Sequence, residues 1–125
     1  DPQVPPVMCS AAEMQQVILN LLRNACQAFT NEEYGAPLHP VITLTTRLTE
    51  HSACIEVSDN GPGMVDAVQR HIFEPFFTTE ATGSGLGLYL SKELCEANHA
   101  NLNFQRTDDN KSCFRIDFAH PDRIF

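Results

Sequence analysis

The feature that most constrains the fold of this chain is a pair of β-strand patterns that occurs twice. Apolar and polar residues alternate at 41–49 (VITLTTRLT) and 53–59 (ACIEVSD), and again at 101–106 (NLNFQR) and 112–118 (SCFRIDF). Two such patterns joined by a short turn are typical of an antiparallel hairpin. Because helical patterns precede both pairs, we predict an α+β fold: a two-layer α/β sandwich with a mixed, largely antiparallel sheet and helices on one face.

Three helices are predicted. The first begins at Ser10 and Glu13, which fit a capping box, and ends near Phe29. Its apolar residues recur at helical spacing and form one stripe: Met14, Val17, Ile18, Leu21, Leu22 and Ala25. A short helix is predicted at 67–73 (AVQRHIF) and a longer one at 88–99 (LYLSKELCEANH).

Composition excludes several kinds of partner. The chain is 42% hydrophobic, and residues 1–125 are predicted to form a single domain of a longer protein. The formal net charge of −8 argues against nucleic acid or an anionic membrane surface as a partner. No apolar run approaches the ~18 residues of a membrane span, so no direct membrane contact is expected. An anionic ligand would have to be held by local amides and a metal ion.

The cysteines indicate a reducing compartment. Their number is odd, none lie in a C-x-x-C pair, and they are spread along the chain: Cys9, Cys26, Cys54, Cys95 and Cys113. This pattern is typical of buried, reduced thiols, rather than of a disulfide framework or a zinc site. We therefore predict a cytoplasmic domain.

Two polar features lie where a ligand could reach them. Asp59, in DNGPGM (59–64), follows a strand pattern, which is a common position for a ligand-reading residue; a simple turn is the alternative. Asn20 and Asn24 lie one turn apart on one face of the first helix, at the edge of its apolar stripe. They form either a solvated edge or a pair of oxygen donors, and a side-chain carbonyl can ligate Mg²⁺.

Two loops complete the candidate site. The glycine-rich run TGSGLG (82–87) precedes a helix, whose free N–H groups and partial positive charge bind phosphate; a flexible hinge is the alternative. The run matches neither a Walker loop nor a Rossmann fingerprint. FEPFF (73–77) either packs into the core or forms a mobile latch over a ligand. Together the four segments predict a purine-nucleotide site.

In order and spacing, these segments resemble the four boxes of histidine-kinase ATP-binding domains. NLLRNA (20–25) resembles the N box, DNGPGM the G1 box, FEPFF the F box and GSGLGL (83–88) the G2 box. That family belongs to the gyrase, Hsp90, histidine kinase and MutL superfamily, and the resemblance implies a Bergerat-type ATP-binding fold. NLLRNACQA and SKELCEANHANL are most similar to the nitrogen-regulation and pilus-regulation sensor kinases.

The resemblance implies a role for each matching residue, with ATP and Mg²⁺ as cofactors. Asp59 would accept a hydrogen bond from the adenine amino group, and Gly61 and Gly63 would let the backbone pass close to the base. Asn24 would hold Mg²⁺, and Asn20 would lie beside the triphosphate. The segment from Met64 to Gly83 would form a lid. Its aromatic residues would also touch the domain with the phosphoacceptor: Phe73, Phe76 and Phe77. The other cofactor-binding residues would be Thr79, Gly83, Ser84, Gly85, Leu86, Gly87 and Leu88.

The resemblance implies that the domain transfers the γ-phosphate of ATP to a histidine. That histidine would lie on a separate dimerisation domain of the same protein. The whole protein would be a two-component sensor kinase that acts on a response regulator. Gyrase and Hsp90 relatives carry a Glu where Asn20 stands, and that Glu activates water. An amide cannot take a proton, which favours a kinase over an ATPase. The alternatives are an anti-sigma-factor serine kinase and a nucleotide-binding regulatory module without phosphotransfer.

Three departures from the family pattern stand out. No histidine is followed by Asp or Glu, so the H box is absent and this chain is not expected to autophosphorylate alone. Glu80 stands where relatives often carry Lys, and it either faces the γ-phosphate or water. The family's first strand is expected to be missing before VPPV, which would expose a sheet edge. We expect a monomer; whether its parent protein is anchored in the inner membrane stays open.

Overall fold

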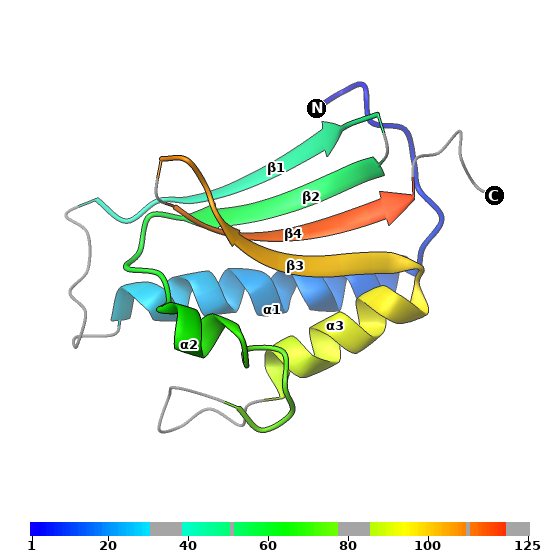
Figure 1. The fold of residues 1–125 in the computed structure, drawn as a ribbon. Helices are drawn as coiled ribbons and strands as arrows, with labels where there is room; N and C mark the ends of the chain where they lie inside the picture. The colour runs from blue at the N-terminus through cyan, green and yellow to red at the C-terminus, as the bar shows by residue number, and fades with distance from the viewer. Residues whose placement is uncertain (31–38, 51, 78–85, 110, 120–125) are drawn as a thin grey trace.

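The chain folds into a four-stranded sheet with helices against one of its faces (Figure 1). This computed structural model describes residues 1–30, 39–50, 52–77, 86–109 and 111–119. The strands are β1 Ile42–Leu48, β2 Ser52–Asp59, β3 Ala100–Arg106 and β4 Ser112–Ala119, in the order β1-β2-β4-β3. Every pairing among these strands is antiparallel. The predicted α+β sandwich is therefore confirmed, with an antiparallel rather than mixed sheet in the part described.

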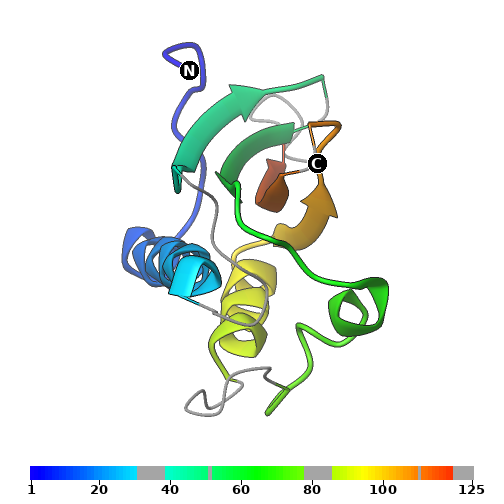
Figure 2. The ribbon, with the colours of Figure 1, turned by 90° about the vertical axis from the view of Figure 1, so that its left-hand side faces the viewer.

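The two long helices lie along the same face of the sheet. α1 (Ala11–Thr30) and α3 (Gly87–Ala97) run beneath the strands, and α2 (Asp66–Gln69) lies beside them, close to where β2 ends (Figures 1 and 2). The C-terminal half of α1, the end of β2 and the start of α3 thus lie toward the same end of the molecule (Figure 1). That end carries the segments singled out by the sequence.

The predicted helix at 67–73 is wrong beyond Gln69, where α2 ends. After that point the backbone N–H groups of His71 and Glu74 bond to carbonyls three residues earlier, which is turn geometry rather than α-helix. Pro75 disfavours helical backbone at Glu74 and donates no hydrogen bond, so a helix could not continue past this point.

The core lies between the sheet and the helices. The apolar stripe predicted on α1 is confirmed, since its residues are buried or pack at the border of the core. Alternate residues of the strands face this stripe and complete the core: Val57, Leu102, Phe114, Ile116 and Phe118. Full burial of one such side chain contributes about 1.5–3 kcal/mol, so the stripe fixes which face of α1 meets the sheet.

The capping box at the start of α1 is only half formed. Ser10 Oγ accepts the N–H of Glu13 at 3.3 Å, as expected. The reciprocal bond is absent, because the N–H of Ser10 is taken by Asn98 Oδ1 at 2.7 Å. Asn98 Nδ2 in turn donates to Glu13 Oε2 at 3.0 Å. Asn98, directly after α3, thereby joins the C-terminal end of α3 to the N-terminal end of α1.

The cysteines correct one expectation. Cys54, Cys95 and Cys113 are buried free thiols, as predicted, but Cys9 and Cys26 are exposed. Cys26 lies on α1 away from the stripe, so the spacing of that stripe could have revealed its exposure. None of the helices within the described residues combines the length and the apolar character that crossing a bilayer requires.

β1 forms one edge of the sheet. Among the described residues, no segment pairs with its outer side. Leu44 faces the helices, yet 52% of it is exposed, because α1 lies mainly under the neighbouring strands. The edge strand is thus less well covered than the centre of the sheet.

Candidate functional site

Asp59 is a buried carboxylate at the end of β2. By strand alternation it points to the same face of the sheet as the core residue Val57, and only 6% of it is exposed. Its Oδ1 accepts the N–H of Gly61 at 2.9 Å. Burial raises the pKa of Asp59 above its usual value, while the Gly61 N–H and the positive charge of Arg106 oppose the rise.

The second oxygen of this carboxylate, Oδ2, has no hydrogen-bond donor in the part of the chain that the structure describes. A carboxylate oxygen without a donor in the protein accepts hydrogen bonds from water or from a ligand. Asp59 is therefore suited to accept a hydrogen bond from a bound molecule.

The two glycines of DNGPGM are required for different structural reasons. A Cβ on Gly61 would lie 2.9 Å from Asp59 Oδ1 and 3.3 Å from the Cβ of Ala28, so any side chain would push the carboxylate aside. Gly63 has a positive φ of 77°, which L side chains rarely adopt. Gly61 thus makes space beside Asp59, and Gly63 makes the turn possible.

Asn60 holds the turn in place. Its Oδ1 accepts the N–H of Val41 at 2.8 Å, and its Nδ2 donates to the carbonyl oxygen of His39 at 2.8 Å. The backbone N–H of Asn60 also reaches the Val41 carbonyl, at 3.3 Å. These bonds tie the residue after β2 to the segment that leads into β1, so this amide has a structural role.

α1 connects the predicted asparagines to the Asp59 turn. Asn20, Asn24 and Ala28 follow one another at intervals of one turn and so lie on one face. Asn20 contacts α3 through a hydrogen bond to Ser91, and Ala28 lies beside Gly61. Asn24 lies between these two contacts and is half-buried, and no described residue forms a hydrogen bond with its side chain. The structure therefore brings Asn20, Asn24 and Asp59 along one side of α1.

Arg106 is a residue of this region that sequence reasoning missed. It ends β3, and its Nη2 donates to the Pro62 carbonyl at 3.4 Å. Its charge also opposes the rise in the pKa of Asp59. Its position at the end of a strand pattern was the available signal, but only the pairing β2-β4-β3 places that strand end near Asp59.

The three phenylalanines of FEPFF differ in their surroundings: some pack into the core, and one is exposed as a latch over a ligand would be. Phe73 packs edge-on against Phe114, with ring centroids 6.4 Å apart, and Lys92 Nζ lies 4.9 Å from the Phe73 ring centroid. Phe77 is half-buried at the border of the core. Phe76 is 73% exposed and has a positive φ of 66°, a strained backbone for a bulky residue. Core packing thus holds for Phe73 and Phe77, and only Phe76 is free to contact another molecule.

The glycine-rich loop is only partly described. Four of the predicted ligand residues lie outside the described residues: Thr79, Gly83, Ser84 and Gly85. Glu80 lies outside them as well. Gly87 is the first residue of α3, and a Cβ there would meet nothing within 4 Å. The Leu86 carbonyl accepts the N–H of Leu90 at 2.8 Å, and Leu88 packs at the border of the core. These positions keep their predicted roles as hypotheses.

The described residues fit a nucleotide better than a metal held by the protein alone. No group of three or more His, Cys, Asp or Glu side chains in the described part could hold a metal ion. The side-chain oxygen of Asn24 could supply one ligand to Mg²⁺, which usually takes its remaining ligands from phosphates and water. The unused oxygen of Asp59 and the space kept by Gly61 fit a planar base with a donor group.

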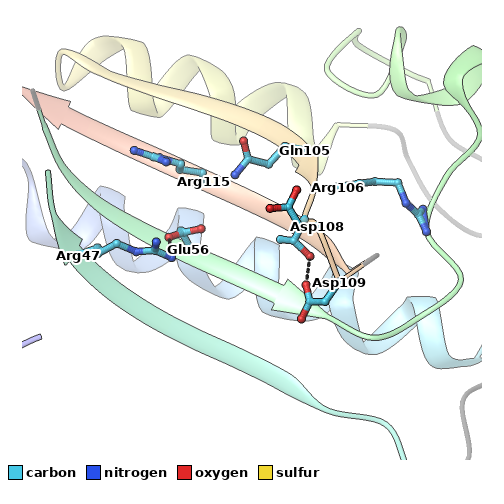
Figure 3. A pocket seen from close by; sticks show the side chains of 8 residues that line it. Arg47, Glu56, Gln105, Arg106, Asp108, Asp109 and Arg115 are labelled. Carbon is cyan, nitrogen blue, oxygen red and sulfur yellow. Dashed lines mark hydrogen bonds and ion pairs between the residues drawn. The ribbon is translucent and has the colours of Figure 1, made fainter.

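A depression lies on the open face of the sheet, which the helices do not cover (Figure 3). It measures about 520 Å³, and two of its arginines form ion pairs: Arg47 with Glu56, and Arg115 with Asp117 at 2.8 Å. Arg106 also lines it, and its side chain extends toward the segment after β2 (Figure 3). None of the ligand residues predicted from the sequence lines it. The candidate site is therefore the one along α1.

Comparisons with known proteins identify relatives of this chain. The chain is 39% identical over 116 residues to the sensor protein kinase PilS of Pseudomonas aeruginosa, and 33% identical over 123 residues to the sensory histidine kinase/phosphatase NtrB of Rhizobium meliloti. These matches cover 90% and 84% of this chain, but only 21% of PilS and 32% of NtrB. The chain thus spans a third or less of these relatives.

Solved structures and a family match complete the comparison. The catalytic domain of the histidine kinase ThkA superposes with a TM-score of 0.73 at 25% identity, covering 90% of this chain and 69% of that one. The mycobacterial sensor histidine kinase MprB shares the fold, with a TM-score of 0.74 at 20% identity, over 90% of this chain and 76% of its own. Residues 9–122 match the family described as histidine kinase-, DNA gyrase B- and HSP90-like ATPase. The chain therefore belongs to this ATPase family, and its relatives are sensor histidine kinases.

Proposed function

We propose that this domain binds Mg-ATP and presents the γ-phosphate to a histidine on a separate domain of the same sensor kinase. The observation that carries the proposal is the buried Asp59 carboxylate, of which one oxygen is held by Gly61 and the other has no donor among the described residues. Bound ATP would supply the phosphoryl group, which leaves ADP and forms a bond to an imidazole nitrogen as that ring loses a proton.

Asp59 would make the site selective for adenine. An ionised carboxylate accepts hydrogen bonds and donates none, so its free Oδ2 matches the amino group of adenine. Guanine presents a carbonyl oxygen at the corresponding position, and two acceptors repel. Gly61 supports this reading, because a side chain there would meet Asp59 Oδ1 and close the space for the base.

The asparagines of α1 would act on the phosphates. Asn24 offers its oxygen to Mg²⁺, and Asn20, one turn earlier, lies beside the triphosphate. Phosphoryl transfer depends mainly on positioning and on neutralising charge, and amide side chains can contribute to both. Because an amide cannot act as a general base toward water, ATP would be kept for the histidine acceptor.

The partners follow from what this chain lacks. None of its histidines belongs to a phosphoacceptor motif: His39, His51, His71, His99 and His120. The acceptor would come from a dimerisation domain elsewhere in the protein, and a response regulator would act downstream. The exposed Phe76 is suited to contact that domain. The domain itself would be a cytoplasmic monomer that binds neither nucleic acid nor membrane.

The test has a binding step and a transfer step. Calorimetric titrations of ATP and GTP, with and without Mg²⁺, would compare this chain with its Asp59→Asn variant. Asp108→Asn, which removes an exposed carboxylate from the turn after β3, is the matched control. We expect ATP but not GTP to bind the parent chain and the control, and the Asp59→Asn variant to lose binding.

The transfer step would combine this chain with labelled ATP and a histidine-bearing helical domain of the same protein. Acid-labile label on that histidine would support the proposal. Label on a Ser or Thr of a partner would favour an anti-sigma-factor type of serine kinase. ATP binding without any transfer would favour a regulatory module.

A further inference from the structure

The hydroxyl group of Ser91 lies in the interface between α1 and α3. Ser91 is in the second turn of α3 and is fully buried. Its Oγ accepts a hydrogen bond from Asn20 Nδ2 at 3.1 Å. Serine is only a middling helix former, and a buried hydroxyl group is costly unless it is paired. The contact with Asn20 therefore gives the buried hydroxyl group a hydrogen-bond partner, which an apolar residue at this position would not need.

In this contact the Nδ2 end of the Asn20 amide faces Ser91. With Nδ2 turned toward the buried Ser91, Oδ1 is left on the exposed side. There it accepts a hydrogen bond from Gln16 Nε2 at 3.3 Å. Gln16 is exposed and lies one turn earlier on α1, so it can move away when a ligand arrives. Without Ser91 the Asn20 amide would lose the hydrogen-bond partner that holds it against α3.

We infer that Ser91 is a positioning residue that holds the Asn20 amide with its oxygen toward bound nucleotide. The inference rests on the proposed function, in which Asn20 lies beside the triphosphate and its metal ion. An outward oxygen favours a cation or the water molecules around it, because Mg²⁺ takes oxygen ligands and keeps several waters. An outward NH₂ group would repel the cation. Ser91 thereby makes the site prefer magnesium-bound over metal-free nucleotide.

The test is a double-mutant cycle on nucleotide binding. Ser91→Ala is expected to weaken the binding of Mg-ATP by about five-fold, the usual worth of one hydrogen bond, and to leave metal-free ATP nearly unchanged. In an Asn20→Ala background, Ser91→Ala should have no further effect, because the group it positions is gone. Cys95→Ala is the matched control: Cys95 is fully buried one turn later on the same helix, and it also loses one heavy atom.

Several outcomes would overturn the inference. Three results would each contradict it: an unchanged Mg-ATP affinity in Ser91→Ala, an undiminished loss of affinity in the Asn20→Ala background, or an equal loss of affinity in Cys95→Ala. In each case, ATP binding by the parent chain would still uphold the proposed function. No ATP binding by the parent chain would overturn both.

A measurement on the parent chain keeps the inference testable if the Ser91→Ala variant does not fold. By NMR, the side-chain NH₂ protons of Asn20 should exchange with water more slowly than those of the exposed Asn103. Slower exchange would support a fixed amide. Equal exchange would show that Ser91 does not hold it.

Discussion

The guanidinium group of Arg106 fills the space that a side chain on Gly63 would need. A Cβ at this position would lie 1.9 Å from Arg106 Nη1, and the backbone of Gly63 has a φ of 77°. Arg106 also donates to the carbonyl oxygen of Pro62. The turn after Asp59 and the end of β3 therefore fit together because residue 63 has no side chain.

Gly63→Ala is expected to lower the free energy of unfolding by about 1–2 kcal/mol, the cost of left-handed backbone for an L residue. The Arg106 guanidinium must also move to admit the new methyl group. Chemical denaturation would measure the change. Gly87→Ala is the control, because a Cβ there meets nothing and alanine is the better helix former. Equal stability of parent and Gly63→Ala would show that the turn does not require glycine.

Asp59→Asn is expected to raise the free energy of unfolding at neutral pH. Burial places the folded-state pKa of Asp59 above its ordinary value of 3.8, so the ionised form opposes folding once the pH exceeds that raised pKa. As the pH falls through the raised pKa toward 3.8, protonation removes this cost in the parent. The stability difference between variant and parent should therefore shrink on acidification. Denaturation curves between neutral pH and pH 3.8 would measure it, and a constant difference would contradict the assignment.

The same variant should lose nucleotide. The amide oxygen of Asn at position 59 can still accept the Gly61 N–H, which turns its NH₂ group toward the base. That donor would then face the donor of adenine, and we expect at least about ten-fold weaker ATP binding. Greater stability together with weaker binding would identify Asp59 as a residue kept for function. A variant that binds ATP as tightly as the parent would show that Asp59 does not read the base.

Asn24→Ala is expected to remove most of the advantage that Mg²⁺ gives to ATP binding. No described residue forms a hydrogen bond with the Asn24 side chain, so the structure itself loses little. Alanine is also the better helix former, by about 0.5 kcal/mol, and the melting temperature should hold or rise. Titration of ATP with and without Mg²⁺ would measure the effect. Metal-dependent binding equal to that of the parent would exclude Asn24 as a metal ligand.

Asn98→Ala tests the link between the two long helices. The Asn98 side chain accepts the N–H of Ser10, and it donates to Glu13 Oε2 and to the carbonyl oxygen of Leu94 at 2.8 Å. Its removal should lower the free energy of unfolding by about 1–3 kcal/mol, because a helix cap and two further partners are lost. Asn103→Ala, at an exposed position on β3, should have a far smaller effect. Equal effects would mean that the link adds no stability.

The elements of this fold could be predicted because local patterns determine them. The stripe on α1 and the alternation in the strands correctly identified the faces that are buried. The pattern failed at α2, which ends at Gln69, before the last apolar residues of the predicted helix. It also placed Asn98 in the last turn of the helix predicted at 88–99, whereas α3 ends at Ala97 and the Asn98 side chain accepts the N–H of Ser10.

The ligand-facing residues of the site were partly visible in the sequence, but the residues behind them were not. Asp59 and Asn24 stand in recognisable segments, and the structure places them along one side of α1. Arg106 and Ser91 act on that side from β3 and α3. Nothing in the local sequence around either residue indicates its partner, because each contact depends on how the strands and helices are arranged in space.

The thiols should separate into two classes by reactivity. Cys9 and Cys26 are exposed, whereas Cys54, Cys95 and Cys113 are buried. Burial raises the pKa of Cys95 to about 11 and that of Cys113 to about 12, so neither forms the reactive thiolate at neutral pH. An aromatic disulfide reagent at pH 8 should therefore modify two thiols in the native chain and the remainder only in denaturant. Cys9→Ser with Cys26→Ser is the control, and it should show no fast reaction. Rapid modification of that double variant would mean that packing between strands and helices does not protect the buried thiols. The native sheet would then open readily.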